Sequence, residues 1–160
     1  KKSKKINKNK TAHGKVFEQE FLNSCKGNNI FVQRIKDDTL SFKNVMNFAD
    51  IICYSYPNLY LLELKSTKQK SLPFSNISRF QIDSLYHYCK QEGIIAGFVI
   101  NFRSYGYQTF FLPADRAYNY YNHADRRSFP LVWVEENGIA LPAKLIRTRY
   151  RFDLSPIVST

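Results

Sequence analysis

The sequence predicts an α/β domain in which helices flank a central mixed β-sheet. Three segments are predicted helices: residues 14–25, the segment that starts near residues 73–76 and ends before Gly93, and residues 113–122. The first two have apolar residues at helical spacing. Short apolar stretches rich in β-branched and aromatic residues are predicted strands: residues 30–35, 49–54, 60–65, 96–102 and 108–112. Because helices and strands alternate along the chain, the helices are expected to pack on the faces of one sheet.

The chain is predicted to be a basic arm followed by one domain. We expect residues 1–12 to be mobile, because residues 1–10 hold six lysines and almost nothing apolar. In a nucleic-acid-binding protein such an arm also supplies phosphate contacts. Residues 13–160 are expected to form a single domain. Its first helix has Phe17 and Phe21 one turn apart on the apolar face.

The centre of the chain is a predicted hairpin whose strands carry three charges. Two apolar strands surround Tyr56-Pro57-Asn58, which is typical of a turn, and they contain Asp50, Glu63 and Lys65. Side chains alternate along a strand, so Glu63 and Lys65 are expected on one face while the neighbouring leucines face the core. Buried charges need partners. A divalent cation between the carboxylates is one interpretation, and a salt bridge at a strand end is the other.

Polar and basic residues follow the hairpin. Residues 66–71 include no core residue and are expected to be a solvated connection that is well placed to hold a DNA backbone. Pro73 and the following Ser75-Asn76 signal the start of the second helix. Gln81 is expected on the side of this helix that faces away from its apolar stripe, and Gly93 ends the segment.

The last thirty residues are predicted to be mostly extended. Residues 131–134 are a predicted strand, residues 136–138 a turn and residues 139–141 a short return strand. Residues 147–151 hold three arginines at alternate positions, which in a strand would share one face. Such a face is either a phosphate-binding ridge or a solvated edge that discourages aggregation.

The composition indicates a globular protein with a polyanionic partner. Of 160 residues 44% are hydrophobic, and the formal net charge of +11 gives a pI near 9.6. Nucleic acid is favoured over a membrane surface because the charge is spread along a mixed sequence. A general bias toward Lys and Asn is the alternative explanation. No apolar run approaches the length of a membrane span, and no signal peptide is visible, so no membrane contact is expected.

Cysteine usage indicates a reducing environment. Cys25, Cys53 and Cys89 lie far apart in apolar settings and form no Cys-x-x-Cys pair, so a zinc site is not expected. Three buried thiols predict a cytoplasmic location.

A set of motifs in a fixed order links this chain to a known family. Asp50 and Glu63-Leu64-Lys65 have the spacing Asp-x12-Glu-x-Lys, and flanking segments carry further motifs: Gly14-Lys15-Val16-Phe17-Glu18, Ile77-Ser78-Arg79-Phe80-Gln81, Gly97-Phe98-Val99-Ile100 and Phe110-Phe111-Leu112-Pro113-Ala114-Asp115. Over about residues 14–122 the chain resembles RecU-type Holliday junction resolvases of the PD-(D/E)xK nuclease superfamily. Four matched segments are more specific than the Glu-x-Lys pattern alone.

The resemblance implies a restriction-endonuclease-like fold and a metal-dependent endodeoxyribonuclease. The cofactor would be Mg²⁺, with Mn²⁺ as a substitute. A homodimer would make paired symmetric nicks in four-way DNA junctions during homologous recombination and DNA repair. The implied site consists of Lys65 and Glu18 as catalytic residues, Asp50, Glu63 and Gln81 as metal ligands, and Lys68, Lys70, Arg79, His13 and Lys15 as DNA contacts.

Three positions depart from the family pattern. Phe48 stands where the family usually has a threonine that contacts the metal, and His13 stands where it has an arginine. The segment of residues 30–50 is shorter than the family's, in which a projecting stalk engages the junction centre.

Two rival functions are compatible with these motifs. One is a related PD-(D/E)xK endonuclease that cuts duplex or flap DNA, which the shortened segment favours. The other is a basic DNA-binding protein without catalysis, whose acidic residues are structural. The presence of Asp50, Glu63 and Lys65 together argues against the second rival.

Overall fold

A mixed β-sheet forms the centre of the computed structural model, which describes residues 11–35 and 47–158. Within these residues the sheet has six strands in the order β1-β2-β3-β5-β6-β8. Their bounds are β1 Phe31–Arg34, β2 Ile51–Ser55, β3 Asn58–Thr67, β5 Ile94–Phe102, β6 Gln108–Pro113 and β8 Ile139–Ala140. Two small antiparallel pairs flank it: β4 (Ser71–Pro73) with β7 (Ser128–Pro130), and β9 (Ala143–Ile146) with β10 (Arg149–Phe152).

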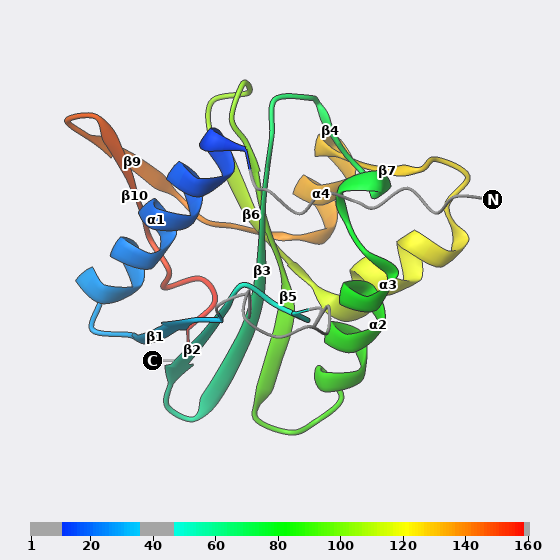
Figure 1. The fold of residues 1–160 in the computed structure, drawn as a ribbon, viewed down its shortest axis with the longest axis horizontal. Coiled ribbons are helices and arrows are strands. Elements are labelled where there is room, and N and C mark those ends of the chain that lie inside the picture. Colours follow the sequence, from blue (N-terminus) through cyan, green and yellow to red (C-terminus); the bar gives the residue numbers. More distant parts are fainter. Residues whose placement is uncertain (1–10, 36–46, 159–160) are drawn as a thin grey trace, which may run out of the picture.

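Helices cover both faces of this sheet, as predicted. Their bounds are α1 Ala12–Gly27, α2 Arg79–Tyr88, α3 Ala114–His123 and α4 Leu131–Asn137, with a single 3-10 turn η1 at Phe74–Asn76. Figure 1 shows α1 on one side of β3 and β5, with α2 and α3 together on the other side. The predicted class, a mixed sheet flanked by helices, is confirmed.

The sheet is buried on both faces because each face packs against its own helices. Leu62 and Leu64 contact the α1 side, where Phe17 is fully buried. On the other face, Leu61 and Phe98 belong to the cluster beneath α2 and α3. The prediction that the leucines of β3 face a core is confirmed, but the face that carries Glu63 is also covered by protein.

β3 is the strand that organises the sheet. It pairs antiparallel with β2, Leu61 opposite Ile52, and parallel with β5, Leu61 opposite Ala96. The predicted hairpin is therefore confirmed, and its second strand lies in the interior of the sheet. β3 continues to Thr67, which is 5% exposed, so the expectation of a connection without core residues from residue 66 onward is wrong at its start.

The segment of residues 131–134 is helical, so the predicted strand is wrong. Leu131 and Val134 are buried while Val132 is 57% exposed. Burial at intervals of three residues is the pattern of a helix, whereas a strand would place Val132 and Val134 on one face. The helix begins directly after Pro130, whose missing N–H costs nothing before a first turn.

The start of α2 also differs from the prediction. Residues around Pro73 form only η1, and the helix itself begins at Arg79. Ser78 caps it, because its Oγ accepts a hydrogen bond from the Gln81 N–H at 3.1 Å.

The cysteines are thiols, and two of them are in contact. The Cys25 and Cys53 sulfurs lie 3.8 Å apart and both residues are buried, whereas Cys89 is partly exposed, against the expectation. Contact with Cys25 and burial raise the pKa of the Cys53 thiol, which keeps it protonated. No helix in the described part of the chain has the length and hydropathy to cross a bilayer. The basic arm of residues 1–10 and most of the segment leading to the hairpin, residues 36–46, lie outside the described residues.

Candidate functional site

The hairpin β2–β3 brings the three predicted charges together. Asp50 directly precedes β2, and its N–H donates to the Leu62 carbonyl at 3.0 Å. Its carboxylate accepts a hydrogen bond from the Leu64 N–H, with Oδ2 2.8 Å from the nitrogen. These two contacts fix Asp50 beside the main chain on both sides of Glu63. The predicted juxtaposition of Asp50 with the Glu63-Leu64-Lys65 motif is therefore present.

Glu63 and Lys65 form a buried ion pair on one face of β3. The Lys65 Nζ lies 3.0 Å from the Glu63 Oε1. The Glu63 side chain is 3% exposed and the Lys65 side chain 17%, so little water reaches the pair. Alternation along the strand explains why both point the same way. The pair is also the salt bridge that the alternative interpretation expects, so this contact alone does not separate the two interpretations.

The donor set at this position suits a hard divalent cation. Carboxylate and carbonyl oxygens are the ligands that Mg²⁺ takes. In an extended strand the N–H and C=O of one residue point to the same neighbour, so the Leu64 carbonyl lies on the side of Asp50. Among the residues that the structure describes, no group of three or more His, Cys, Asp or Glu side chains is placed to hold a metal. A cation would therefore depend on two carboxylates and a main-chain oxygen.

Gln81 has a structural partner in addition to its predicted role as a ligand. It is the third residue of α2 and 6% exposed. Its Oε1 accepts the Ser78 N–H at 3.2 Å, which with the Ser78 Oγ contact completes a capping box. The prediction that Gln81 faces away from the apolar stripe did not foresee its burial.

Glu18 lies on the α1 side of the sheet. Its Oε1 is 2.6 Å from the Arg34 Nη2, and its side chain is 7% exposed. Arg34 in turn lies opposite Ile51 in the sheet, next to Asp50 in sequence. Since Glu63 points to the other face of β3, Glu18 approaches the hairpin from the opposite side. Its catalytic role stays a prediction. Arg34 had no distinguishing signal in the sequence.

A second buried carboxylate, Glu20, was not singled out from the sequence. It accepts hydrogen bonds from the Tyr107 hydroxyl and from the Tyr150 N–H, the latter at 2.5 Å. These partners are 87 and 130 residues away in the chain, so no local pattern could have indicated them. Burial first, and the Glu20 contact second, raise the pKa of Tyr107. The arrangement ties α1 to β10 and is structural.

The predicted DNA contacts are at the surface, but they differ in how they are held. His13 and Lys15 are exposed near the start of α1, and Lys68 and Lys70 are exposed in the connection after β3. Arg79 is occupied by protein groups. Its guanidinium donates to Asp83 at 3.1 Å and to Asn122 at 2.7 Å.

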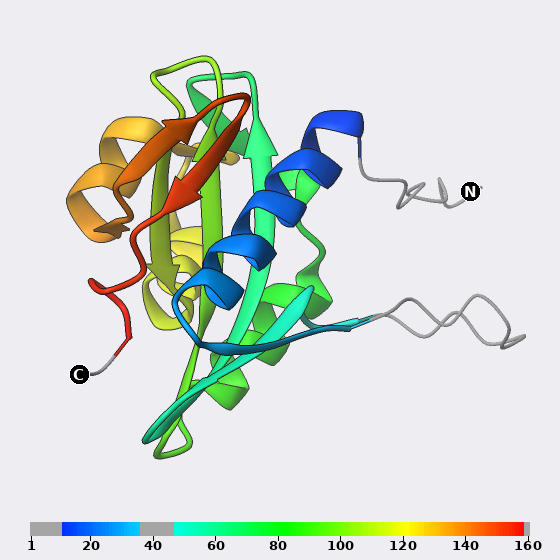
Figure 2. The same cartoon turned by 90° about the vertical axis from the view of Figure 1, so that its left-hand side faces the viewer.

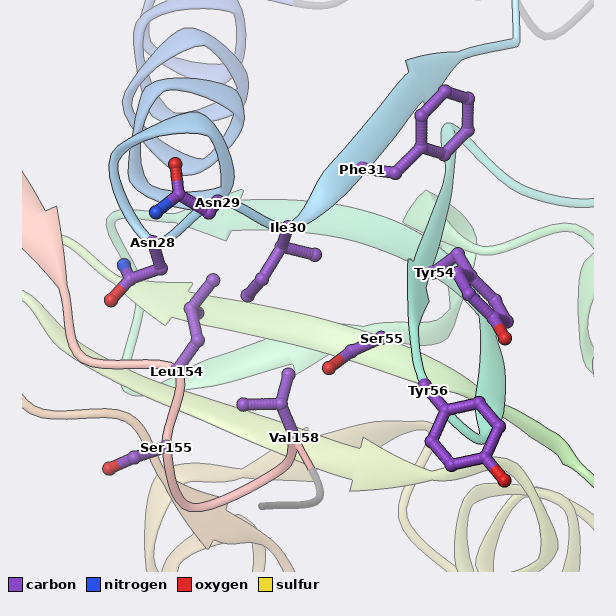
Figure 3. Close-up of a pocket in the computed structure, with 10 residues that line it drawn as sticks. All are labelled: Asn28, Asn29, Ile30, Phe31, Tyr54, Ser55, Tyr56, Leu154, Ser155 and Val158. Atoms are coloured by element: carbon purple, nitrogen blue, oxygen red, sulfur yellow. The ribbon is translucent and has the colours of Figure 1, made fainter.

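One hollow in the described part of the chain lies away from these charges. It measures about 420 Å³ and is lined by residues at the other end of β2, including Tyr54, Ser55 and Tyr56. Figure 3 shows Phe31, Tyr54 and Tyr56 at its rim, with Leu154 and Val158 on the opposite side. Five residues of strand separate Asp50 from Ser55, about 17 Å at 3.3 Å per residue. Because it contains no titratable carboxylate or lysine, we do not assign it to catalysis.

Comparison with known families agrees with this geometry. The model of the family RecU, described as recombination protein U, matches residues 49–154. The match begins just before Asp50 and includes the whole hairpin, and it spans more than half of the chain. The chain belongs to the RecU family. As the motifs predicted, it is a RecU-type Holliday junction resolvase and hence a nuclease.

Two individual proteins are also similar. The SPbeta prophage-derived uncharacterized protein YotM of Bacillus subtilis (strain 168) is 28% identical, over 90% of this chain and 84% of its own length. Among solved structures, Hjc of Archaeoglobus fulgidus, a Holliday junction resolvase from an archaeal hyperthermophile, has the same fold. The match has a TM-score of 0.56 with 16% sequence identity and covers 79% of this chain and 95% of Hjc.

Proposed function

We propose that this RecU-family chain resolves Holliday junctions by Mg²⁺-dependent phosphodiester hydrolysis, with its site at the hairpin β2–β3. The observation that carries the proposal is the buried Glu63–Lys65 pair at 3.0 Å, with Asp50 bound to the Leu64 N–H between them. A purely structural salt bridge between Glu63 and Lys65 does not need a second carboxylate, Asp50, bound to the main chain between them. Two carboxylates and a lysine do match the needs of metal-assisted hydrolysis.

Asp50, Glu63 and the Leu64 carbonyl would hold the cation. Bound Mg²⁺ would lower the pKa of a water and neutralise charge on the phosphate oxygens. Lys65 would orient the attacking water or stabilise the negative charge of the transition state, and its partial burial makes its charge more effective there. Gln81 would be a further ligand through its amide oxygen, which has a second lone pair beyond the bond to Ser78. Glu18 would position water or a second cation.

The proposed substrate is a four-way junction, and the proposed assembly is a homodimer. A four-way junction has two-fold symmetry, so two symmetric nicks require two sites, and a homodimer supplies them. Lys68, Lys70, His13 and Lys15 would bind phosphates around the site, since their side chains are exposed. Arg79 would join them at the edge of α2. The thiols of Cys25 and Cys53 agree with a reducing, cytoplasmic location.

The test is cleavage of a labelled four-way junction beside a matched linear duplex, in Mg²⁺ and in Mn²⁺. The native chain is compared with Glu63→Gln and with Glu135→Gln, which changes an exposed carboxylate on α4. We expect paired symmetric nicks in the junction alone, lost in Glu63→Gln and retained in Glu135→Gln. Binding of the junction should persist in both variants.

Other outcomes would point to the rival functions. Equal cleavage of the linear duplex would keep the nuclease and remove the junction specificity. Binding by the native chain without cleavage in either metal would mean that the acidic residues are structural. Cleavage by Glu63→Gln at the native rate would exclude the hairpin as the site.

A further inference from the structure

The β9–β10 hairpin is a two-stranded ribbon separate from the central sheet. Figures 1 and 2 show this two-stranded ribbon extending beside α1, on the side of the sheet away from α2 and α3. Lys144 lies opposite Arg151, and Leu145 opposite Tyr150. All four residues of β9 are exposed. The ribbon has no role in the site proposed at the hairpin β2–β3, because Glu63 points to the other face of the sheet.

One face of the ribbon anchors it to the body. The Tyr150 ring stacks on Tyr107, with centroids 3.8 Å apart and planes at 8°. Phe152 is 3% exposed and packs against Phe17 with ring centroids 5.8 Å apart. The Glu20 carboxylate accepts the Tyr150 N–H. These contacts hold the base of the ribbon against α1, so the ribbon has a defined position.

The opposite face of the ribbon is cationic. Lys144 and Arg151 are directly opposite, and Arg149, two residues before Arg151, shares their face. Like charges at directly opposed positions destabilise a β-ribbon. Arg147 adds a fourth cation at the turn, where its φ is 59°. The predicted face of three arginines is therefore corrected: Arg147 is in the turn, and Lys144 takes its place.

Within the described part of the chain, none of Lys144, Arg149 and Arg151 forms an ion pair with a carboxylate. The sequence has no Asp or Glu between Glu136 and Asp153. The Arg149 and Arg151 guanidinium groups donate to main-chain carbonyls of the ribbon itself, at 3.2 Å each. A repulsive cluster on an anchored ribbon has a cost that a polyanionic partner would offset.

We propose that the cationic face formed by Lys144, Arg149 and Arg151 binds the phosphate backbone of a duplex arm of DNA. This rests on the proposed function, which supplies the DNA. A two-stranded ribbon fits against the major groove, and contacts to phosphates carry no sequence preference. In this proposal the ribbon, which lies on the α1 side of the sheet, binds an arm other than the one that is cut. A four-way junction offers such an arm, whereas a short linear duplex does not.

The experiment measures how binding depends on salt. The affinity of the native chain for a four-way junction is determined by fluorescence anisotropy in EDTA, over salt concentrations of roughly 50 to 300 mM. The triple variant Lys144→Ala/Arg149→Ala/Arg151→Ala should give a slope of log K against log salt that is shallower by about 2 to 3, because each phosphate contact contributes about 0.9. The control Lys26→Ala/Lys90→Ala/Arg116→Ala removes the same charge from other exposed positions and should change the slope less.

A second variant separates binding from folding. Lys144→Glu places opposite charges across the ribbon from Arg151, so its Tm should equal or exceed that of the native chain while junction binding weakens. A slope change no larger than that of the control, in a native chain that binds and cuts junctions, would overturn the ribbon proposal alone. A native chain that fails to bind DNA would overturn it together with the proposed function. Unchanged binding with a shift from dimer to monomer would assign the ribbon, with its exposed Leu145 and Ile146, to a second copy of the chain instead.

Discussion

Replacing Lys65 by methionine tests whether the buried charges of the hairpin act as one unit. Methionine keeps an unbranched side chain of similar length and removes the ammonium group. The Glu63 carboxylate, with a side chain only 3% exposed, then loses the cation that lies 3.0 Å from its Oε1. A buried carboxylate without this neighbour is costly because few water molecules reach it.

The expected cost follows from the burial of the two groups. Removing one partner of a buried ion pair costs about 3 to 5 kcal/mol. Because Lys65 is 17% exposed, we expect the lower end, about 3 kcal/mol. For a chain of this size that corresponds to a fall in Tm of roughly 9 °C, at about 3 °C per kcal/mol. The double variant Lys65→Met/Glu63→Gln should lose less than the sum of the single variants, with a coupling of at least about 1 kcal/mol.

Urea unfolding at neutral pH gives the free energies, and junction cleavage is measured on the same samples. Lys65→Met should bind the junction and fail to cut it. Added Mg²⁺ should raise the Tm of Lys65→Met more than that of the native chain, because a cation between the carboxylates substitutes for the lost ammonium. Additive effects of the two substitutions, together with cleavage at the native rate, would refute the reasoning.

Two other substitutions test contacts around the site. Gln81→Ala should lower the free energy of unfolding by about 1 kcal/mol through loss of the capping box with Ser78. If Gln81→Ala cuts the junction as slowly as Glu63→Gln does, Gln81 is a metal ligand and not only part of the helix cap. In Tyr107→Phe the free energy of unfolding should fall less steeply with pH above about pH 10, the ordinary pKa of tyrosine, than in the native chain. Burial and Glu20 raise the folded-state pKa of Tyr107, so its contribution is complete below about pH 10 and is lost as pH rises through that pKa. The free energy of unfolding is measured by urea titration at a series of pH values. An equal dependence on pH above about pH 10 for the native chain and Tyr107→Phe would contradict this.

The parts of the fold that were predictable are those set by local patterns. The hairpin β2–β3 could be predicted because its apolar strands and its turn are contiguous in sequence, and Glu63 and Lys65 share a face by alternation alone. The predicted strand at residues 131–134 is wrong because local propensity and tertiary packing favour different structures there. Residues 131–134 are β-prone in composition, but burial of Leu131 and Val134 on one side stabilises a helix.

The contacts that could not be predicted join residues far apart in the chain. Glu20 binds Tyr107 and Tyr150, and nothing in the spacing of these residues indicates the pairing. The ion pair of Glu18 with Arg34 could not be predicted either, because Arg34 lies on an edge strand of only four residues. The place of Lys144 on the same face as Arg149 and Arg151 is set by the pairing of β9 with β10, which the sequence does not show. Periodicity indicates the face on which a side chain lies, but a cross-strand partner depends on register.

Register is also what connects the fold to the candidate chemistry. The Asp50 N–H donates to the Leu62 carbonyl and its carboxylate accepts the Leu64 N–H, so the pairing of β2 with β3 also places this carboxylate at the residue that follows Glu63. A slip of one residue in β3 would turn Glu63 and Lys65 toward α1 and bring leucines to their place. Burial of apolar side chains on both faces of β3 opposes such a slip. The hydrophobic pattern of one hairpin therefore specifies both the centre of the sheet and the alignment of the charged site. The DNA contacts proposed on β9–β10 instead depend on tertiary contacts that hold the ribbon against α1.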